Sequence, residues 1–274
     1  MGKRSDDELY QDRYKIVVKS NELIQKSRFD LTLQQQKIIL YLISQINPWD
    51  EDFKLYKFNI KDFCKICGIE NNWYYIELKN AIQEIANKSL WIKLPSGTET
   101  LVRWIEKPYI NANEGTIEIK LDDDMKPYLL LLKKNFTRYE LFWILMFNSK
   151  YSIRLYEVIK SFHYNEDKDY IKSINLEELK IMLGAGHYTD YRDFRRRVLE
   201  KAISEINKYS DKIIEYKPIR KGKTIEVIEF TIKTKETMAR IKLYSEIEKE
   251  LGFNQLTLWE ILEENNLIEG KDNE

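Results

Sequence analysis

Arginine and lysine side chains gather in one window of the sequence. Residues 192 to 223 hold 11 basic and 5 acidic residues, and the basic ones fall on a helix pattern and on the turn of a hairpin pattern. Guanidinium groups contact guanine or clamp phosphate in bidentate geometry, so the window predicts contact with nucleic acid. The candidates on the helix are Arg192, Arg195, Arg196, Arg197 and Lys201. Those on the hairpin turn are Lys217, Arg220, Lys221 and Lys223.

An apolar seam indicates where the arginines of this helix point. Apolar residues recur every four positions and predict one buried face, formed by Phe194, Val198, Ala202 and Ile206. Arg192 and Arg196 then lie along one edge of that face. Arg197 and Lys201 lie along the other edge. Arg195 lies nearer the seam, so it either has a structural role or reaches outward because the helix end projects.

The total charge conceals this window. Lys+Arg and Asp+Glu both number 45 among 274 residues, so the formal net charge is zero. By region, residues 1–184 carry a net charge of +1, residues 185–233 carry +4 and residues 234–274 carry −5. The zero excludes a uniformly basic binder but not a local basic patch, because a field depends on where charges sit. A solvated helix face is the plain alternative for the arginine run, and the basic hairpin turn beside it favours DNA.

Residues for other chemistry are sparse. His163 and His187 are the two histidines and form no paired-histidine motif, and Cys64 and Cys67 form a single C-x2-C on an apolar helix. Zinc would need a second pair, so buried free cysteine is the better interpretation. The sequence also lacks a phosphate-binding G-x-x-x-x-G-K-[ST] loop. We therefore expect no catalytic residue, no cofactor and no metal.

The sequence shows no signal for secretion or membrane insertion, so we expect a cytoplasmic location. The sequence has no run of about 18 apolar residues, and its N-terminus lacks the apolar core of a signal peptide. We expect a protein without membrane contact.

An internal repeat organises the chain. Three pairs of similar segments keep their order, namely residues 40–41 with 155–156, 59–68 with 175–184, and 81–85 with 202–206. Each copy reads as a helix, a short strand, an Asn-capped helix ending at Gly, a longer helix and an alternating hairpin. This order is typical of a winged helix. The fold class predicted is α+β and helix-rich, with two tandem winged-helix domains and an acidic helical C-terminal tail.

The repeat also sets the expected boundaries. We expect a disordered N-terminus at 1–13, an N-terminal winged-helix domain at 14–136 for dimerisation and DNA contact, a C-terminal winged-helix domain at 137–233 as the main DNA-binding unit, and the tail at 234–274. Helical patterns mark 239–251 and 256–267 within the tail. The tail either binds a partner or shields the basic face in the absence of DNA.

The first copy offers fewer groups for DNA. Asn72 and Lys79 lie on its longer helix, and Lys93 and Arg103 lie on its hairpin. Amides can read adenine, but aromatic residues at helical spacing, as in this helix, are more often core. Base reading by the first copy is therefore an open alternative, and we keep its four residues as candidates.

The sequence resembles the plasmid replication-initiator (Rep) proteins of theta-replicating plasmids, which often carry iterons. The resemblance runs from residue 14 to 232. Its matching segments are Tyr14 to Asn21, Leu31 to Lys37, Phe136-Thr-Arg-Tyr139, Ser149 to Glu157, and Phe194 to Ile206. Lys201 stands where the family often has proline, which should add charge and lengthen the helix. The acidic tail lies outside the resemblance.

The resemblance implies two winged-helix domains that bind repeated origin sites, recruit host replication proteins such as a helicase or an initiator, and repress the initiator's own gene. In that family, monomers bind direct repeats, dimers bind an inverted operator, and dimerisation uses the N-terminal domain. We therefore expect a non-enzymatic, sequence-specific binder of double-stranded origin DNA with a monomer–dimer equilibrium. A dedicated transcriptional repressor is the first alternative, and a rolling-circle nicking enzyme is the second.

Overall fold

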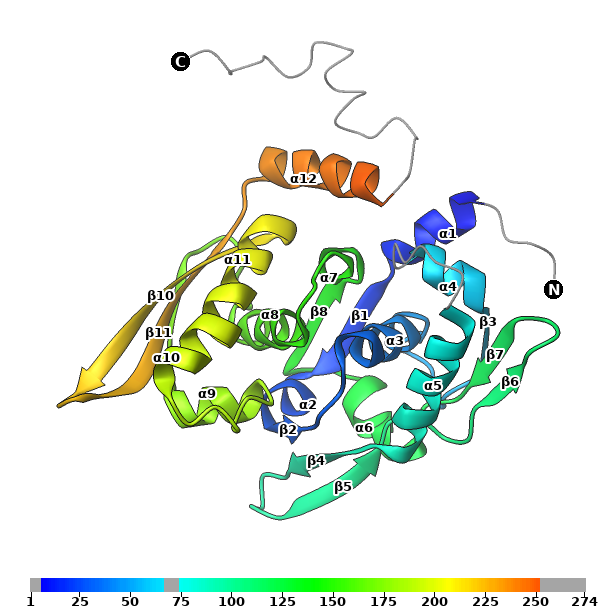
Figure 1. The fold of residues 1–274 in the computed structure, drawn as a ribbon, viewed down its shortest axis with the longest axis horizontal. Coiled ribbons are helices and arrows are strands. Elements are labelled where there is room, and N and C mark those ends of the chain that lie inside the picture. The colour runs from blue at the N-terminus through cyan, green and yellow to red at the C-terminus, as the bar shows by residue number, and fades with distance from the viewer. Residues whose placement is uncertain (1–5, 67–73, 252–274) are drawn as a thin grey trace, which may run out of the picture.

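The computed structural model describes residues 6–66 and 74–251, and its first part is a winged helix with added strands (Figure 1). The helices of this part are α1 (Asp6–Arg13), α2 (Asn21–Lys26), α3 (Leu33–Ser44), α4 (Ile60–Ile66), α5 (Tyr74–Asn87), the 3-10 helix η1 (Asp123–Met125) and α6 (Lys126–Leu129). The strands are β1 (Ile16–Ser20), β2 (Ser27–Arg28), β3 (Tyr56–Asn59), β4 (Ser89–Lys93), β5 (Glu99–Arg103), β6 (Tyr109–Asn111) and β7 (Thr116–Ile119). The antiparallel β4–β5 hairpin is the predicted wing, with Trp91 opposite Leu101.

The second part repeats this order more compactly. It contains β8 (Phe136–Glu140), α7 (Phe142–Leu145), α8 (Lys150–Phe162), β9 (Tyr170–Asn175), α9 (Leu176–Met182), α10 (Tyr191–Phe194), the π turn η2 (Arg195–Leu199), α11 (Glu200–Tyr209), β10 (Lys212–Lys221) and β11 (Thr224–Thr234). Strands β10, β11 and β9 form one antiparallel sheet in that order. The long β10–β11 hairpin is the second wing, which extends away from the body in Figure 1. The predicted pair of winged helices is confirmed.

Local capping explains where the helices of the second part begin. The side chain of Asn175 accepts hydrogen bonds from the backbone N–H groups of Glu177 and Glu178, as the sequence predicts. Helix α9 is followed by Gly184 at φ +66°, where a Cβ would lie 3.2 Å from the carbonyl oxygen of Phe29. The hydroxyl of Ser149 caps α8 in the same way as Asn175 caps α9. These caps satisfy backbone groups that a helix end leaves unpaired.

The apolar seam of the arginine-rich helix is buried as predicted. Its four members are fully buried and comprise Phe194, Val198, Ala202 and Ile206. They pack in a core with the inward-facing residues of the second wing, which are Ile214, Ile228, Phe230 and Ile232. The seam therefore fixes the helix against its sheet and leaves the opposite helix face to solvent.

The two parts are joined more closely than a boundary at 136/137 allows. Strand β1 pairs antiparallel with β8, with Val17 opposite Tyr139 and Ser20 opposite Phe136. The expected boundary thus falls inside β8, and the strand that it separates from the N-terminal unit completes a sheet with that unit. Buried Arg154 on α8 also donates to the carbonyl of Ile24 at 3.1 Å and to that of Met182 at 2.8 Å. One guanidinium therefore links the ends of α2 and α9.

The N-terminus corrects another expectation. The polar composition of residues 1–13 predicts disorder, but Asp6–Arg13 form α1. Leu9 is 3% exposed, and Arg13 is fully buried and donates to the carbonyl oxygen of Lys65 on α4 at 2.6 Å. Burial of one leucine and one hydrogen-bonded arginine holds this helix, although its composition carries little apolar periodicity.

The C-terminal tail begins with a docked helix, α12 (Thr237–Glu250). Its Leu243 and Ile247 are buried, and the ring of Tyr244 lies 4.8 Å from that of Phe142 and 4.4 Å from that of Trp143. In Figure 1, α12 lies at the edge of the molecule opposite the β4–β5 hairpin. The first predicted tail helix is confirmed, and the second, at 256–267, lies outside the described residues.

Candidate nucleic-acid interface

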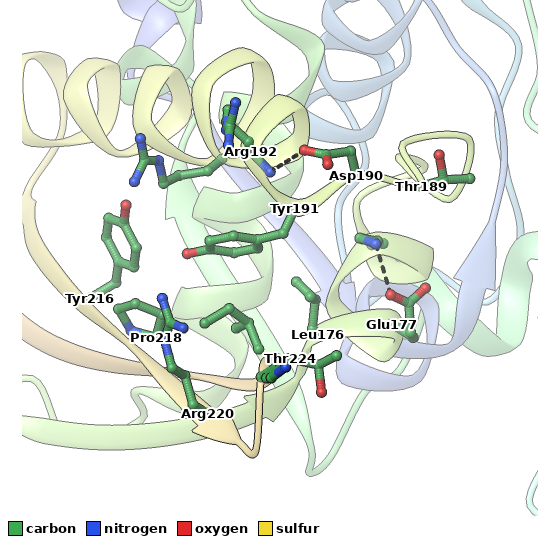
Figure 2. A pocket seen from close by; sticks show the side chains of 14 residues that line it. Leu176, Glu177, Thr189, Asp190, Tyr191, Arg192, Tyr216, Pro218, Arg220 and Thr224 are labelled. Atoms are coloured by element: carbon green, nitrogen blue, oxygen red, sulfur yellow. Dashed lines mark hydrogen bonds and ion pairs between the residues drawn. The ribbon is translucent and has the colours of Figure 1, made fainter.

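The arginine-rich helix starts at a strong cap. The carboxylate of Asp190 accepts hydrogen bonds from the backbone N–H groups of Arg192 at 2.6 Å and Asp193 at 3.2 Å. This cap fixes the positive end of the helix dipole beside the second wing, where it adds to the charge of Arg192. Figure 2 shows Asp190 and Arg192 at the mouth of a groove between helix and wing.

A π turn sets the positions of the three consecutive arginines. Across Arg195–Leu199 the helix widens, and the N–H of Glu200 bonds to the carbonyl of Arg195. A π turn holds one residue more than an α turn, which changes the helix phase locally. Phe194 and Val198 on either side stay buried, while Arg195, Arg196 and Arg197 are all exposed. Arg195, placed nearest the seam by 3.6-residue periodicity, therefore projects outward and is not a core residue.

The other arginines of this helix make only surface ion pairs. Arg196 lies 3.3 Å and Arg197 3.7 Å from the same carboxylate oxygen of Asp193. Exposed pairs of this kind contribute little to stability, so a phosphate can replace Asp193 with little loss of free energy. Lys201, one turn further on, is exposed as well.

The second wing carries the predicted basic turn. Gly222 makes the tight turn between β10 and β11. Its φ of +62° is a backbone conformation that residues with a side chain rarely adopt. A register shift follows Ile219, so the tip departs from the regular ladder. The four basic residues of this tip are exposed and comprise Lys217, Arg220, Lys221 and Lys223.

Helix and wing enclose an open groove of about 900 Å³. Five cationic residues line it, namely Lys180, Arg192, Arg195, Arg220 and Lys223, together with Glu177 and Asp190. Lys180 pairs with Glu177 at 2.7 Å, and Asp190 is engaged by the helix cap. Arg192 and Arg195 of the helix and Arg220 of the wing thus line one concave surface, which fits a polyanion. Arg196, Arg197 and Lys201 are exposed but do not line it.

Two tyrosines, Tyr191 and Tyr216, form the wall of the groove between helix and wing (Figure 2). The hydroxyl of Tyr216 on β10 donates to Glu200 at 3.3 Å. Burial first, and then the charge of Glu200, raise the pKa of Tyr216 to about 12, so this hydroxyl keeps its proton at neutral pH. Glu200 also lies 3.4 Å from Nε of Arg195. Sequence reasoning missed Lys180, Tyr191, Tyr216 and Glu200. Only Tyr216 carried a signal, because it lies two residues after core residue Ile214 on β10 and so shares its face of the strand.

The first copy contributes nothing to this groove among the residues described. Lys93 and Arg103 are exposed on the β4–β5 wing, and Lys79 is half-buried on α5. Asn72 lies outside the described residues. By the offset that relates Ala81 to Ala202, Ile76 stands where Arg197 stands, and it is 57% exposed. The equivalent helix therefore presents an apolar side chain at that position.

Other kinds of site find no support in the described part of the chain. Cys64 is buried and unpaired, and burial raises the pKa of its thiol to about 11, whereas Cys67 lies outside that part. Within residues 6–66 and 74–251, no three His, Cys, Asp or Glu side chains gather as metal ligands. None of the helices there is long and apolar enough to traverse a bilayer.

Comparison with known families assigns this architecture. The sequence model described as "Initiator Replication protein, WH1" matches residues 16–160, and "Initiator Rep protein, WH2" matches residues 175–232. The chain belongs to the initiator replication protein family. The resemblance found in the sequence is thereby confirmed. The WH1 match ends at residue 160, within α8, and includes both β1 and β8, which pair with each other.

Two Escherichia coli proteins resemble this initiator family member over part of its length. A "Replication initiation protein" from Escherichia coli is 28% identical over 204 residues, which are 72% of this chain and 63% of that protein. A "PI protein" from Escherichia coli is 34% identical over 124 residues, 40% of each chain. The chain thus spans less than two thirds of the length of either relative.

A solved structure supports the fold. The crystal structure of the Pi initiator protein in complex with iteron DNA superposes with a TM-score of 0.69 at 24% identity. The match covers 82% of this chain and 99% of that one. At this identity the likeness establishes the fold of the initiator family for this chain.

Proposed function

We propose that this chain is a sequence-specific double-stranded DNA-binding protein that initiates plasmid replication at repeated origin sites and represses its own gene. The observation that carries the proposal is the groove in which Arg192 and Arg195 of the helix face Arg220 and Lys223 of the wing. A winged helix places its longer helix in the major groove and its wing on the adjacent backbone. Both elements are basic here, and both lie within the WH2 match at residues 175–232.

We assign the candidate residues the following roles. Arg192, Arg195, Arg196 and Arg197 enter the major groove, where a bidentate arginine reads guanine. Lys201 extends the basic face of the helix. The wing residues Lys217, Arg220, Lys221 and Lys223 neutralise phosphates, which adds affinity without sequence preference. Lys79, Lys93, Arg103 and Asn72 make further contacts from the first winged helix.

The descriptions of two similar proteins support this proposal. One is a replication initiation protein, and the solved neighbour is an initiator in complex with iteron DNA. By the same reasoning we propose a monomer–dimer equilibrium, contact with a host helicase or initiator, a cytoplasmic location and no catalytic step. Each of these is an inference from the family and the groove.

A binding experiment tests the proposal directly. The full chain is used to select duplexes from a random-sequence pool and to footprint the DNA that flanks its own gene. We expect one repeated sequence to emerge from both, with an affinity that falls steeply as salt rises, by about 0.9 log units per log unit of salt for each phosphate contact. Failure to enrich any sequence contradicts the proposal.

Paired substitutions assign the binding to the helix. Arg192→Ala with Arg196→Ala should weaken the selected duplex by at least about tenfold, since base-reading contacts contribute about 1–3 kcal/mol each. Lys242→Ala with Lys249→Ala removes the same charge from α12 and should leave the affinity within about twofold. Equal losses in both pairs would mean that total charge, and not the helix, governs binding.

Two alternatives remain distinguishable. A dedicated repressor with the same domains predicts that a plasmid lacking the gene is still maintained, whereas an initiator predicts its loss. A rolling-circle nicking enzyme predicts a covalent protein–DNA adduct in a labelled-strand assay. We expect loss of the plasmid and no adduct.

A further inference from the structure

An acidic side chain stands among the cations of the arginine-rich helix. Glu200 follows directly on the π turn, and its side chain is 47% exposed. One of its carboxylate oxygens, Oε1, lies 3.4 Å from Nε of Arg195 and accepts the hydroxyl of Tyr216 at 3.3 Å. The same atom therefore contacts the helix and the β10 strand of the wing.

The charge of Glu200 works against a simple DNA-attracting surface. A carboxylate near phosphate groups repels them, and within a Debye length this lowers the affinity for any duplex. As an isolated surface ion pair, its bond to Arg195 would contribute little. We therefore consider that Glu200 positions other side chains, and its contacts with Arg195 and Tyr216 indicate which ones.

We infer that Glu200 is a positioning residue for sequence recognition: it orients Arg195 into the groove and ties the wing to the helix through Tyr216. The inference rests on the proposed function, because it presumes that this groove receives DNA. In this role, Glu200 sets the distance between the base-reading arginines of the helix and the phosphate-binding residues of the wing.

The π turn makes this arrangement possible. It brings the carbonyl of Arg195 to the N–H of Glu200, so these two residues, five apart, lie one above the other. In an uninterrupted α-helix, residues three and four apart are the neighbours on one face. The widened turn thus supplies both the outward direction of Arg195 and the carboxylate that holds it.

Positioning and simple charge predict opposite signs for one substitution. Bidentate reading of guanine needs a fixed guanidinium plane, whereas attraction to phosphate tolerates many side-chain positions. Loss of orientation therefore weakens only the specific complex. Loss of a negative charge strengthens binding to every duplex.

The test measures two duplexes with the full chain. One is the duplex that the wild-type chain selects from a random-sequence pool, and the other has the same base composition in shuffled order. For Glu200→Gln we expect affinity for the selected duplex to fall about tenfold, in the range of one base contact, and affinity for the shuffled duplex to stay equal or rise. A rise for both duplexes overturns the inference. Tyr216→Phe, which removes only the hydroxyl, should lower the ratio of the two affinities in the same direction by a smaller factor.

Matched variants separate this role from folding and from bulk charge. Glu215→Gln makes the same charge change on the residue before Tyr216, whose side chain faces the opposite side of the sheet, and should leave the ratio unchanged. In an Arg195→Gln, Tyr216→Phe background, adding Glu200→Gln should not lower the ratio further, because both partners are already gone. A further fall in that background contradicts the inference, as does a lowered melting temperature that accounts for the whole effect. If the wild-type chain prefers no duplex, the proposed function has failed, and not the role of Glu200 within it.

Discussion

Lys19 on β1 and Glu157 on α8 form an ion pair at 2.7 Å between Nζ and Oε1, across 138 residues of sequence. Both side chains are at most 3% exposed. Tyr139 donates its hydroxyl to the same carboxylate oxygen at 2.6 Å, and Arg154 approaches the other oxygen at 3.5 Å. Burial alone would raise the pKa of Glu157, but the charges of Lys19 and Arg154 hold it below its usual range. A buried network of charged and hydroxyl groups therefore joins β1 and β8 to α8.

Breaking this pair from one side should be severely destabilising. Lys19→Met leaves Glu157 with fewer compensating charges in a buried site, and removal of one partner of such a pair costs about 3–5 kcal/mol. Urea unfolding measures the loss. The double variant Lys19→Met with Glu157→Met should lose clearly less than the sum of the two single variants, since each leaves the other's charge uncompensated. Additive losses would mean that the two residues act independently.

Features decided by neighbours in the chain could be predicted from the sequence. Asn175 caps α9 and Gly184 follows it at positive φ, because a helix start and stop depend on residues a few positions apart. The order of helices and hairpins followed from periodicity for the same reason. The pairing of β8 with β1 could not, because the alternation of Phe136 to Glu140 does not say which strand lies beside it. Helix α1 was missed because its burial depends on contacts with α4, far along the chain.

The candidate site divides in the same way. Composition was enough to find the basic residues of helix and wing, and the apolar seam was enough to find the buried helix face. The direction of Arg195 stayed open between a structural role and an outward one, because a period of 3.6 residues places it near the seam and the π turn breaks that period. Glu200 and Tyr216 could not be paired in advance, since their contact depends on how β10 crosses the helix.

The wing should contribute affinity without sequence preference. Replacing Lys221 and Lys223 by glutamine removes two predicted phosphate contacts, so affinity should fall equally for the selected and the shuffled duplex. The slope of log affinity against log salt should become shallower by about 0.9 for each phosphate that the variant no longer neutralises. Fluorescence anisotropy titrations at several salt concentrations measure both quantities. A decrease confined to the selected duplex would instead place base reading in the wing.

Helix α12 should stabilise the fold through its buried face. Ile247 is 1% exposed, and Ile247→Ala should lower the free energy of unfolding by about 2–5 kcal/mol, as for other large-to-small core changes. Met238 on the same helix is 42% exposed, so Met238→Ala is a matched control that should stay within about 0.5 kcal/mol. Equal effects of the two changes in urea unfolding would show that α12 is not docked.

The contacts of α12 also bear on shielding of the basic face by the tail. Tyr244 packs on Phe142 and Trp143 and donates to Glu140, and none of these residues lines the groove. A chain ending at residue 236 should therefore be less stable than the full chain but keep the same salt slope for DNA. A steeper affinity gain at low salt in the shortened chain would support shielding.

Glu166 should make stability depend on acid pH. Burial alone would raise the pKa of Glu166, but Lys160 at 2.5 Å and Lys212 at 3.2 Å lower it to about 2. A carboxyl whose pKa is depressed on folding stabilises the protein above its unfolded pKa, about 4.3, and loses that contribution as pH falls through the folded value. Because the side chain is 41% exposed, solvent screening limits the contribution to about 1 kcal/mol.

The difference in unfolding free energy between wild type and Glu166→Gln should thus be constant from pH 7 to 5 and shrink toward zero near pH 2. Urea unfolding across this range measures it, with Glu215→Gln on the exposed sheet face as the control. A difference that stays constant down to pH 2 would mean that the two lysines do not hold this carboxylate in its charged form.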